Sequence, residues 1–439
     1  MIKMKKILSC TLCAAMIMSL AACGSSNSNK ASSSAETSKN ESFGAGETKK
    51  LVFWDKSEYV AAYNKMMKEK VDQFAEENNV EVDYVIVPSG DLKQKLAAAI
   101  ESGNQPDLIM GDNTTVAEYV ATNQLAEVTD VIDKIDYKEN AKAYSKFDDK
   151  DYLVPVSLTA PGMYIRNDKW SKAPTTWEEL KAEAEKINDP ENGFYALGLP
   201  LGASGGGDAE TFVRTVILDF GGRLVDENGN VTANSPETLA AMEYIASLYE
   251  DGLCPPDAIT WDDSANNSAY LAGTVGMICN SGSVVTSMQE ENPDLLAKTD
   301  IIQYPSLSAD STSYTLGGAN VFGIFETGAN TEVAKDFVSY YFGDSDFYNQ
   351  MVEAMGSMWQ PVIKGYDETD FWKEETHSGW LQNSMNLSLT TYPAPTESKA
   401  AVAFSNQLCT KAMQEIVVNG TDPQTALDNL ESALKEIYK

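Results

Sequence analysis

The sequence predicts an α/β protein of two lobes, each with a mostly parallel β-sheet flanked by helices. The chain has 439 residues, which is too long for one ordinary domain and long enough for two lobes that each bury a core. From Leu51 onward, short apolar runs alternate with segments whose apolar residues recur at helical spacing. Strands that alternate with helices are joined by right-handed crossovers, which favour parallel pairing.

The first elements follow this alternation from residue 51 to residue 122. A β-rich run ends at Pro88, and the amphipathic segment after it stops at Gly103. Ligands bind such sheets at the loops that follow the carboxyl ends of the strands. The loops 55–59, 88–91 and 111–115 are therefore candidate site segments. We expect strands at 51–54, 80–87 and 107–110, and helices at 60–77, 91–102 and 114–122.

A second series of elements begins near residue 152. We expect strands at 152–155 and 163–166, followed by a helix near Trp177 that Thr175 or Thr176 caps. The segment 224–231 predicts a hairpin whose turn is Asn228-Gly229. Its acidic residues do not predict a calcium loop, because the glycine stands fourth rather than sixth and no glutamate stands twelfth.

The N-terminus has the pattern of a secretory signal. Three lysines precede an apolar run that ends at Ala22, and Leu20-Ala21-Ala22-Cys23 looks like the lipobox of bacterial lipoproteins. We expect a signal peptide at 1–22, lipidation of Cys23 and a flexible tether at 23–48, because that polar stretch is too poor in apolar residues to fold. The protein would then be extracytoplasmic and lipid-anchored to the outer face of the cytoplasmic membrane. The alternative is an ordinary cleaved signal in which Cys23 has no role.

Charge and composition exclude several functions. The chain has 33 basic and 65 acidic residues, a formal net charge of −32, so nucleic acids and anionic lipid surfaces would repel it. The single histidine, His377, excludes histidine-rich zinc sites, and we expect no metal and no cofactor. Beyond the N-terminal segment the cysteines are Cys254, Cys279 and Cys409; their odd number and apolar surroundings predict buried thiols.

Several motifs, taken in order, resemble the family 1 extracellular solute-binding proteins of the maltodextrin-binding type, which are receptors of sugar ABC importers. The resemblance runs from about residue 50 to the end of the chain. The motifs are LVFWD at 51–55, PDLIM at 106–110, LAEVT at 125–129, the block from Pro155 to Trp170 followed by PTTWEEL at 174–180, YLAGTVGMICNSG at 270–282 and GGANVFGI at 317–324.

This resemblance implies a two-lobed periplasmic-binding-protein fold of type II, with one ligand in the interlobe cleft. It places the N-lobe at 49–156 and 306–355 and the C-lobe at 157–305 and 356–439, with hinges near Pro155, Tyr304-Pro305 and Gly356. Closure on the ligand would shift the population to the form that a membrane permease recognises. The implied partners are a carbohydrate ligand and the transmembrane subunits of an ABC permease, and the implied state is a monomer without enzymatic activity.

A sugar site needs aromatic platforms and side chains that donate and accept hydrogen bonds. Trp261 and Trp359 are each either a stacking platform or a packing residue. By loop position, the ligand-binding candidates are Lys56, Glu58, Tyr59, Asp112, Asn113, Thr159, Ser204, Asp208, Trp261, Asn280, Ser283, Gly318, Asn320 and Trp359.

Departures from the family pattern argue against malto-oligosaccharide and favour another mono- or oligosaccharide as the ligand. Ile165-Arg166 stands where a maltodextrin binder has Tyr-Asn, and the glycine-rich stretch 202–208 replaces an aromatic-rich loop. That stretch lacks the Gly-Lys-Ser/Thr ending of a phosphate loop. Two alternatives remain, a receptor for a polyamine or peptide and a surface glycosidase with two catalytic carboxylates. Asp262 and Asp263 fit a solvated loop better than a catalytic pair.

Overall fold

The computed structural model describes residues 49–439 except 59, 148, 204–206 and 395–397. The predicted signal peptide and tether lie outside the described residues. The strands are β1 (Lys49–Lys56), β2 (Val80–Val87), β3 (Leu108–Asp112), β4 (Lys146–Phe147), β5 (Lys150–Asp151), β6 (Leu153–Thr159), β7 (Gly162–Arg166), β8 (Met277–Asn280), β9 (Thr299–Ile302), β10 (Thr315–Leu316), β11 (Gly318–Ile324), β12 (Gln360–Pro361) and β13 (Leu387–Ser388).

Helices separate most of these strands along the chain. The α-helices are α1 (Ala61–Asn78), α2 (Ser89–Glu101), α3 (Asn113–Ala117), α4 (Thr129–Ile132), α5 (Glu139–Lys142), α6 (Trp177–Ile187), α7 (Asp208–Asp219), α8 (Pro236–Glu250), α9 (Ala265–Leu271), α10 (Ser283–Glu291), α11 (Pro293–Leu296), α12 (Ala329–Gly343), α13 (Ser345–Met355), α14 (Asp370–Lys373), α15 (Glu375–Met385), α16 (Ser398–Ser405), α17 (Leu408–Val417) and α18 (Pro423–Ile437). Short 3₁₀ turns lie at Pro190–Asn192, Ala258–Thr260 and Gly356–Met358. No helix in the described part of the chain is long and apolar enough to cross a bilayer.

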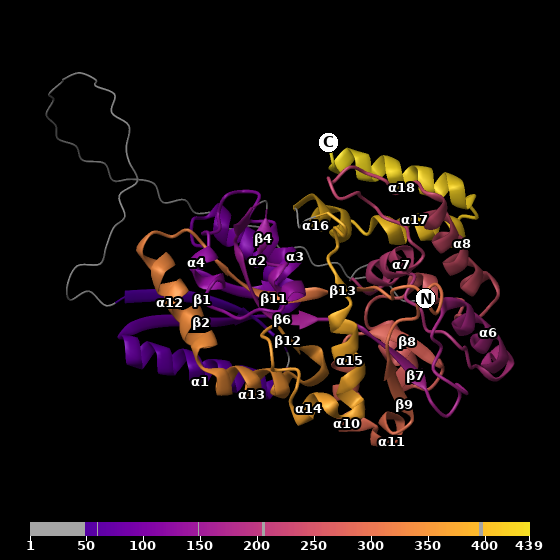
Figure 1. Ribbon diagram of the computed structural model, residues 1–439, viewed down its shortest axis with the longest axis horizontal. Coiled ribbons are helices and arrows are strands. Elements are labelled where there is room, and N and C mark those ends of the chain that lie inside the picture. The colour runs from indigo at the N-terminus through magenta and orange to yellow at the C-terminus, as the bar shows by residue number, and fades with distance from the viewer. Residues whose placement is uncertain (1–48, 59, 148, 204–206, 395–397) are drawn as a thin grey trace, which may run out of the picture. The chain divides into compact units, whose positions relative to one another are not determined.

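Six strands form the first sheet in the order β12-β6-β11-β3-β1-β2 (Figure 1). Strand β1 pairs in parallel with β2 and β3, as the strand–helix alternation predicts. Strand β11 runs antiparallel to both of its neighbours, and β12 runs antiparallel to β6. The α/β class is therefore confirmed, but the expectation of a mostly parallel sheet is wrong here, because three of the pairings are made by strands that return from distant parts of the chain.

The helical spacing seen in the first amphipathic segment buries one face of α1. Tyr63, Met67, Val71 and Phe74 are each at most 2% exposed, and α1 packs beside β2. Phe337 of α12 packs on the opposite side of this aromatic group, edge-on to Phe74. These side chains belong to one hydrophobic core that is continuous with the first sheet.

The second sheet has three strands in the order β8-β7-β9, and both pairings are antiparallel (Figure 1). The expectation of a mostly parallel second sheet is therefore also wrong. Strands β8 and β9 run in the same direction, and α10 and α11 connect them. However, β7 lies between them and runs the other way. A helical crossover fixes the direction of the two strands that it joins, but not which strand lies between them.

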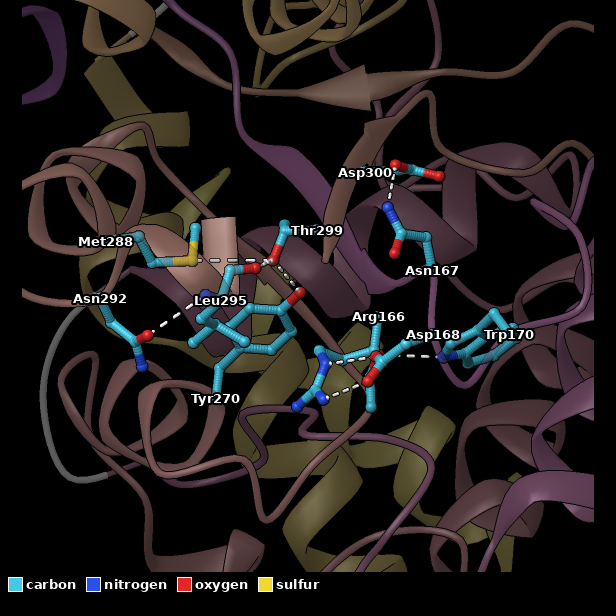
Figure 2. Close-up of polar contacts among 11 residues, drawn as sticks. Arg166, Asn167, Asp168, Trp170, Tyr270, Met288, Asn292, Leu295, Thr299 and Asp300 are labelled. Carbon is cyan, nitrogen blue, oxygen red and sulfur yellow. Dashed lines mark hydrogen bonds and ion pairs between the residues drawn. The ribbon is translucent and has the colours of Figure 1, made fainter. Parts of the chain in front are cut away.

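Polar contacts surround the C-terminal end of β7, the central strand of the second sheet (Figure 2). Arg166 forms a two-pronged ion pair with Asp168, at 2.7 and 2.8 Å. The indole N–H of Trp170 donates to the Gly276 carbonyl at 2.9 Å. The hydroxyls of Tyr270 and Thr299 share a hydrogen bond of 2.9 Å. Arg166, which departs from the family pattern, is thus held by its own neighbour in the chain.

A second core contains the inner residues of α6, α7, α8, α17 and α18 together with the second sheet. Helix α6 begins as the sequence predicts: Thr176 Oγ1 accepts from the Glu179 N–H at 3.2 Å, and Glu179 accepts from the Thr175 N–H at 2.9 Å. The indole N–H of Trp177 donates to Asp219 at 3.0 Å. The predicted buried thiols are confirmed, because Cys254, Cys279 and Cys409 are free and buried.

The chain passes between the two sheets more than once. It leaves the first sheet at the end of β6 and enters the second at β7, with Ala160-Pro161 between them. Trp359, Val362 and Trp372 belong to the first core although the sequence places 356–439 in the second lobe. Conversely, Ser306 hydrogen-bonds to the Thr175 carbonyl near the start of α6. A segment that crosses between the sheets can pack into either core, and its position in the sequence does not show which core that is.

Candidate ligand-binding site

Residues of the first sheet, together with helices and loops next to the second sheet, line a cavity of about 430 Å³, which we call the central pocket. Side chains from β3–α3 and β11 line it on one side, and the start of α7 and the loop before α9 line it on the other. The segments between β6 and β7 and before β11 also reach it. Its lining residues are Asp112, Asn113, Thr114, Thr159, Pro161, Gly207, Asp208, Thr211, Asp263, Ser281, Gly317, Gly318, Ala319, Thr390 and Phe404.

The first wall of the pocket is held by a buried lysine. Lys56, the last residue of β1, is 8% exposed and donates to Asp112 Oδ1 at 2.7 Å and Asn320 Oδ1 at 2.9 Å. Its Nζ also lies 3.0 Å from Glu58 Oε1. Burial opposes the charge on Lys56, but the carboxylates of Asp112 and Glu58 outweigh burial and raise its pKa. The ammonium group therefore stays charged and fixes Asp112 at the pocket surface.

The second wall holds two carboxyl groups, and among the described residues no lysine or arginine pairs with either of them. Asp263 accepts the backbone N–H groups of Gly207 and Asp208, at 2.8 and 3.1 Å. Asp208 Oδ2 accepts from Asn280 Nδ2 at 2.9 Å. Burial and the nearby charge of Asp263 raise the pKa of Asp208 to about 7. Asp208 can therefore present either a carboxylate or a protonated carboxyl group near neutral pH.

Glycine keeps the pocket open where β11 begins. A Cβ atom at Gly318 would lie 2.9 Å from Asn113 Oδ1 and 3.2 Å from Thr159 Oγ1. That Asn113 oxygen already accepts the Ala319 N–H at 3.0 Å, so it cannot move away without losing a hydrogen bond. A side chain at Gly318 would therefore displace two polar groups that line the pocket.

Phe404 is the aromatic residue among the described lining residues. The guanidinium carbon of Arg214 lies 5.3 Å from the centre of its ring, which is within the range of a cation–π contact. Arg214 is itself buried and paired with Glu210 at 2.7 Å. The arginine contacts the ring, and the ring contributes an apolar surface to a pocket that also has polar groups.

Comparison with known proteins identifies the type of protein to which this pocket belongs. The profile of the bacterial extracellular solute-binding proteins matches residues 55–346, more than half of the chain. The chain belongs to this family. As a member of an extracellular family, this solute-binding protein acts outside the cytoplasm.

Individual relatives are distant but cover most of the chain. A putative binding protein of Brucella abortus is 25% identical over 90% of this chain and 94% of its own length. A galactooligosaccharide-binding protein of Bacillus subtilis is 22% identical over 97% of this chain and 95% of its own. A solute-binding protein of Thermotoga lettingae, solved with α-D-tagatose bound, has a TM-score of 0.74 at 18% identity and covers 89% of this chain and all of its own. This last likeness confirms the two-lobed fold.

The structure brings together only part of the candidate site that the sequence predicts. Asp112, Asn113, Thr159, Asp208 and Gly318 line the central pocket. Lys56, Glu58 and Asn320 are not among the lining residues. Lys56 donates to Asp112, which lines the pocket, and also contacts Glu58 and Asn320. Asn280 supports Asp208, and the Ser283 hydroxyl lies 3.2 Å from that of Ser281, which lines the pocket. Tyr59 and Ser204 lie outside the described residues.

Both tryptophans proposed as platforms lie elsewhere in this solute-binding protein. Trp359 is fully buried in the first core, edge-on to Tyr63 with ring centres 5.2 Å apart. The platform interpretation of Trp359 is therefore corrected, because an enclosed ring offers no face to a ligand. Trp261 lines a different cavity from the central pocket.

Sequence reasoning missed several residues of the pocket. Asp263, interpreted as part of a solvated loop, lines the pocket and anchors the start of α7. Phe404 lies in a helix whose apolar pattern looks like ordinary packing, so no local signal distinguishes it. Thr114 lies in the candidate loop 111–115, and Gly207 and Ala319 adjoin the candidates Asp208 and Gly318; the other missed residues are Pro161, Thr211, Ser281, Gly317 and Thr390. The polar residues after β3 and before α7 were the detectable signal.

Proposed function

We propose that this solute-binding protein captures a short carbohydrate in the central pocket and delivers it to the transmembrane subunits of an ABC permease. The observation that supports the proposal is the pocket's composition: its described lining combines carboxyl, amide and hydroxyl groups with one aromatic ring. Sugars offer hydroxyls around their edges and C–H groups on their faces, so such a pocket complements them.

The size of the pocket favours a small sugar. A cavity of about 430 Å³ lies at the lower end of the range for small-molecule sites, which is about 300–1,000 Å³. The relatives' ligands support the class, since one relative binds galactooligosaccharide and a structural neighbour holds tagatose. We propose a mono- or disaccharide rather than a longer malto-oligosaccharide.

Binding would be coupled to closure of the two lobes. The pocket is lined by residues of the first sheet, by the start of α7, by the loops before α9 and after β8, and by the segment between β6 and β7, so a ligand in it contacts parts that hinge motion would move. A ligand that contacts both walls only in the closed form shifts the population toward that form. We propose this closed form as the state that the permease recognises, and a monomer as the unit that closes.

The proposal is tested by thermal-shift and calorimetric titration of the full-length chain against a panel of mono- and disaccharides, with spermidine and a tripeptide alongside. A sugar should raise the unfolding temperature, and Asp208→Ala should abolish the shift while the variant remains folded by circular dichroism. If no sugar in the panel binds and a non-sugar does, the carbohydrate proposal fails.

A polyamine is the second candidate ligand, because of the pocket's charge. Asp112, Asp208 and Asp263 line it, and its described lining contains no lysine or arginine. A polyamine would bind through these carboxylates, and its affinity would fall steeply with salt. A sugar makes mainly neutral hydrogen bonds, so its affinity should change little between low and physiological ionic strength.

We propose that the bound ligand leaves unchanged, although three carboxyl groups line the pocket. A glycosidase needs one carboxylate free to act as nucleophile or base. Both oxygens of Asp263 already accept backbone N–H groups, which makes it a structural residue. Chromatography of the ligand after long incubation should recover it intact, and release of shorter sugars would contradict this part of the proposal.

We further propose a lipid anchor on Cys23, which rests on the sequence pattern alone. Two acyl chains there would hold the protein at the outer face of the cytoplasmic membrane. Mass spectrometry of the mature N-terminus should find a diacylglyceryl cysteine, and Cys23→Ala should release the protein from the membrane fraction. An unmodified N-terminus at another residue would reject the anchor.

A further inference from the structure

A second cavity lies on the other side of the segment that carries Asp263. This side pocket has a volume of about 640 Å³ and shares no lining residue with the central pocket. Asp262 and Ser264 line the side pocket, whereas Asp263 between them lines the central pocket. Its lining residues are Gly193, Tyr195, Pro255, Asp257, Trp261, Asp262, Ser264, Ala265, Ser268, Ala269 and Thr274.

The side pocket has fixed walls. Tyr195 is held beside the strand-like segment before β8, because its N–H donates to the Thr274 carbonyl and its carbonyl accepts from the Gly276 N–H, both at 2.9 Å. The backbone of Trp261 packs so closely on Gly202 that a Cβ atom there would lie 2.1 Å from the Trp261 carbonyl oxygen. The backbone of Tyr195 and Trp261, the two aromatic residues of the side pocket, is therefore held in place by its neighbours.

Hydroxyl groups in the side pocket have their hydrogens already engaged. Ser264 Oγ donates to Asp262 Oδ1 at 2.7 Å. Ser268 Oγ donates to the Ser264 carbonyl, and Thr274 Oγ1 donates to the Ala269 carbonyl, each at 3.0 Å. A hydroxyl has one hydrogen and two acceptor lone pairs, so each of these oxygens can still accept. Together with the carboxylates of Asp257 and Asp262, they make the pocket a set of acceptors beside two aromatic rings.

We propose that the side pocket is a second carbohydrate site, distinct from the central pocket. A sugar supplies what these walls lack, since its hydroxyls donate hydrogen bonds and its C–H face packs on an aromatic ring. Trp261, which the sequence leaves as either a stacking platform or a packing residue, is 8% exposed and belongs to the second core, so only a small part of it reaches the side pocket. Tyr195 is half-buried and offers the more accessible ring. The inference does not depend on the ligand proposed for the central pocket.

The experiment is a calorimetric titration of the full-length chain with maltose, cellobiose, lactose and N,N′-diacetylchitobiose at millimolar concentrations. We expect a binding event that Ser268→Trp, which fills the side pocket, weakens by about tenfold or more. Ala272→Trp serves as the matched control, because Ala272 is exposed just beyond α9 and does not line the pocket. Asp208→Ala should leave this event unchanged, which separates it from binding in the central pocket.

A second readout reports on Trp261 itself. In the full-length chain labelled with 5-fluorotryptophan, the fluorine resonance that disappears in Trp261→Phe should shift on addition of the sugar that binds. The shift should persist in Asp208→Ala and be lost in Ser268→Trp. If none of the four sugars binds in a way that Ser268→Trp weakens, or if spermidine alone moves the Trp261 resonance, the proposal is overturned.

Discussion

The two walls of the central pocket hold carboxyl groups by different means. On the first wall, the buried Lys56 contacts Asp112 and Glu58 and keeps a fixed charge within the protein. On the second wall, Asp208 and Asp263 rely on amide and backbone N–H groups, and no lysine or arginine in the described part of the chain is paired with either. Burial therefore raises the pKa of Asp208 to about 7, with Asp263 adding to the effect.

The two walls can therefore offer a ligand different kinds of hydrogen-bonding groups. On the first wall, the charged Lys56 holds the Asp112 side chain in place through a hydrogen bond of 2.7 Å. On the second wall, a carboxyl group that titrates near neutral pH can accept or donate, as a sugar hydroxyl does. The first wall is fixed by its lysine, and the second can adapt its hydrogen-bond direction to the ligand. Four predictions test this contrast.

Replacing the lysine should have the largest effect. Lys56→Met leaves Glu58 buried without its partner, so we expect unfolding in urea to show a loss of about 3 kcal/mol. Lys50→Met is the control, because Lys50 and Glu81 form an exposed pair, and its cost should stay below about 1 kcal/mol. Equal losses in the two variants would mean that the first wall does not depend on Lys56.

Removing the anchor of the second wall should cost somewhat less. Asp263→Ala leaves the N–H groups of Gly207 and Asp208 without their acceptor, and we expect a loss of about 2 kcal/mol in the same assay. It also removes a negative charge beside Asp208, so the pKa of Asp208 should fall. Asp257→Ala, at an exposed position, should change neither quantity. A stability equal to that of this control would show that Asp263 is not structural.

The pH dependence of stability should distinguish the second wall from the first. The folded-state pKa of Asp208 lies above its ordinary value of 3.8, so the folded protein holds a proton that the unfolded chain has lost between about pH 4 and 7. The contribution of Asp208 is complete below pH 3.8 and is lost as the pH rises through about 7, with a slope of at most about 1.4 kcal/mol per pH unit.

Comparing urea unfolding of the wild type and Asp208→Asn from pH 5 to pH 8 isolates this contribution. The wild type should gain stability relative to the variant as the pH falls. Asp55, buried with a pKa of about 7, adds a slope of the same sign in both proteins, so it cancels in the difference. Parallel curves would mean that Asp208 is ionised throughout.

The smallest effect is expected at the edge of the first wall. Gly318→Ala would press on Asn113 and Thr159, and we expect ligand affinity to fall by about 1 kcal/mol, or fivefold. Gly90→Ala is the control, since a Cβ atom there meets nothing within 4 Å. Titration calorimetry measures both, and an unchanged affinity for Gly318→Ala would place the ligand away from β11.

Local signals predicted many elements closely. The strand expected at 80–87 has those bounds, and the helix expected at 60–77 is found at Ala61–Asn78. The helix expected at 114–122 ends early, at Ala117. The hairpin expected at 224–231 is found in a short form: Val225 and Val231 form an antiparallel bridge, and the Asp226 N–H donates to the Asn230 carbonyl. Asp226 Oδ1 also accepts the N–H groups of Asn228 and Asn230 within the turn.

The candidate site was predicted less completely than the elements. Loop position alone finds Asp112, Asn113 and Asp208, because polar residues at the ends of strands and helices are visible in the sequence. It could not find Phe404, which comes to the pocket from a helix near the C-terminus, or show that Trp359 is enclosed. These facts depend on which distant segments pack together.

The sequence by itself determined the α/β class, the family and the polar loops from which a site could be built, because apolar periodicity and motif order are local properties of the chain. Tertiary structure alone decided the direction of the returning strands, the pairing of Lys56 with Asp112 and Asn320, and the placement of Asp262 and Asp263 in two different pockets. Burial and neighbouring charge exist only after packing, and they set the protonation of Asp208.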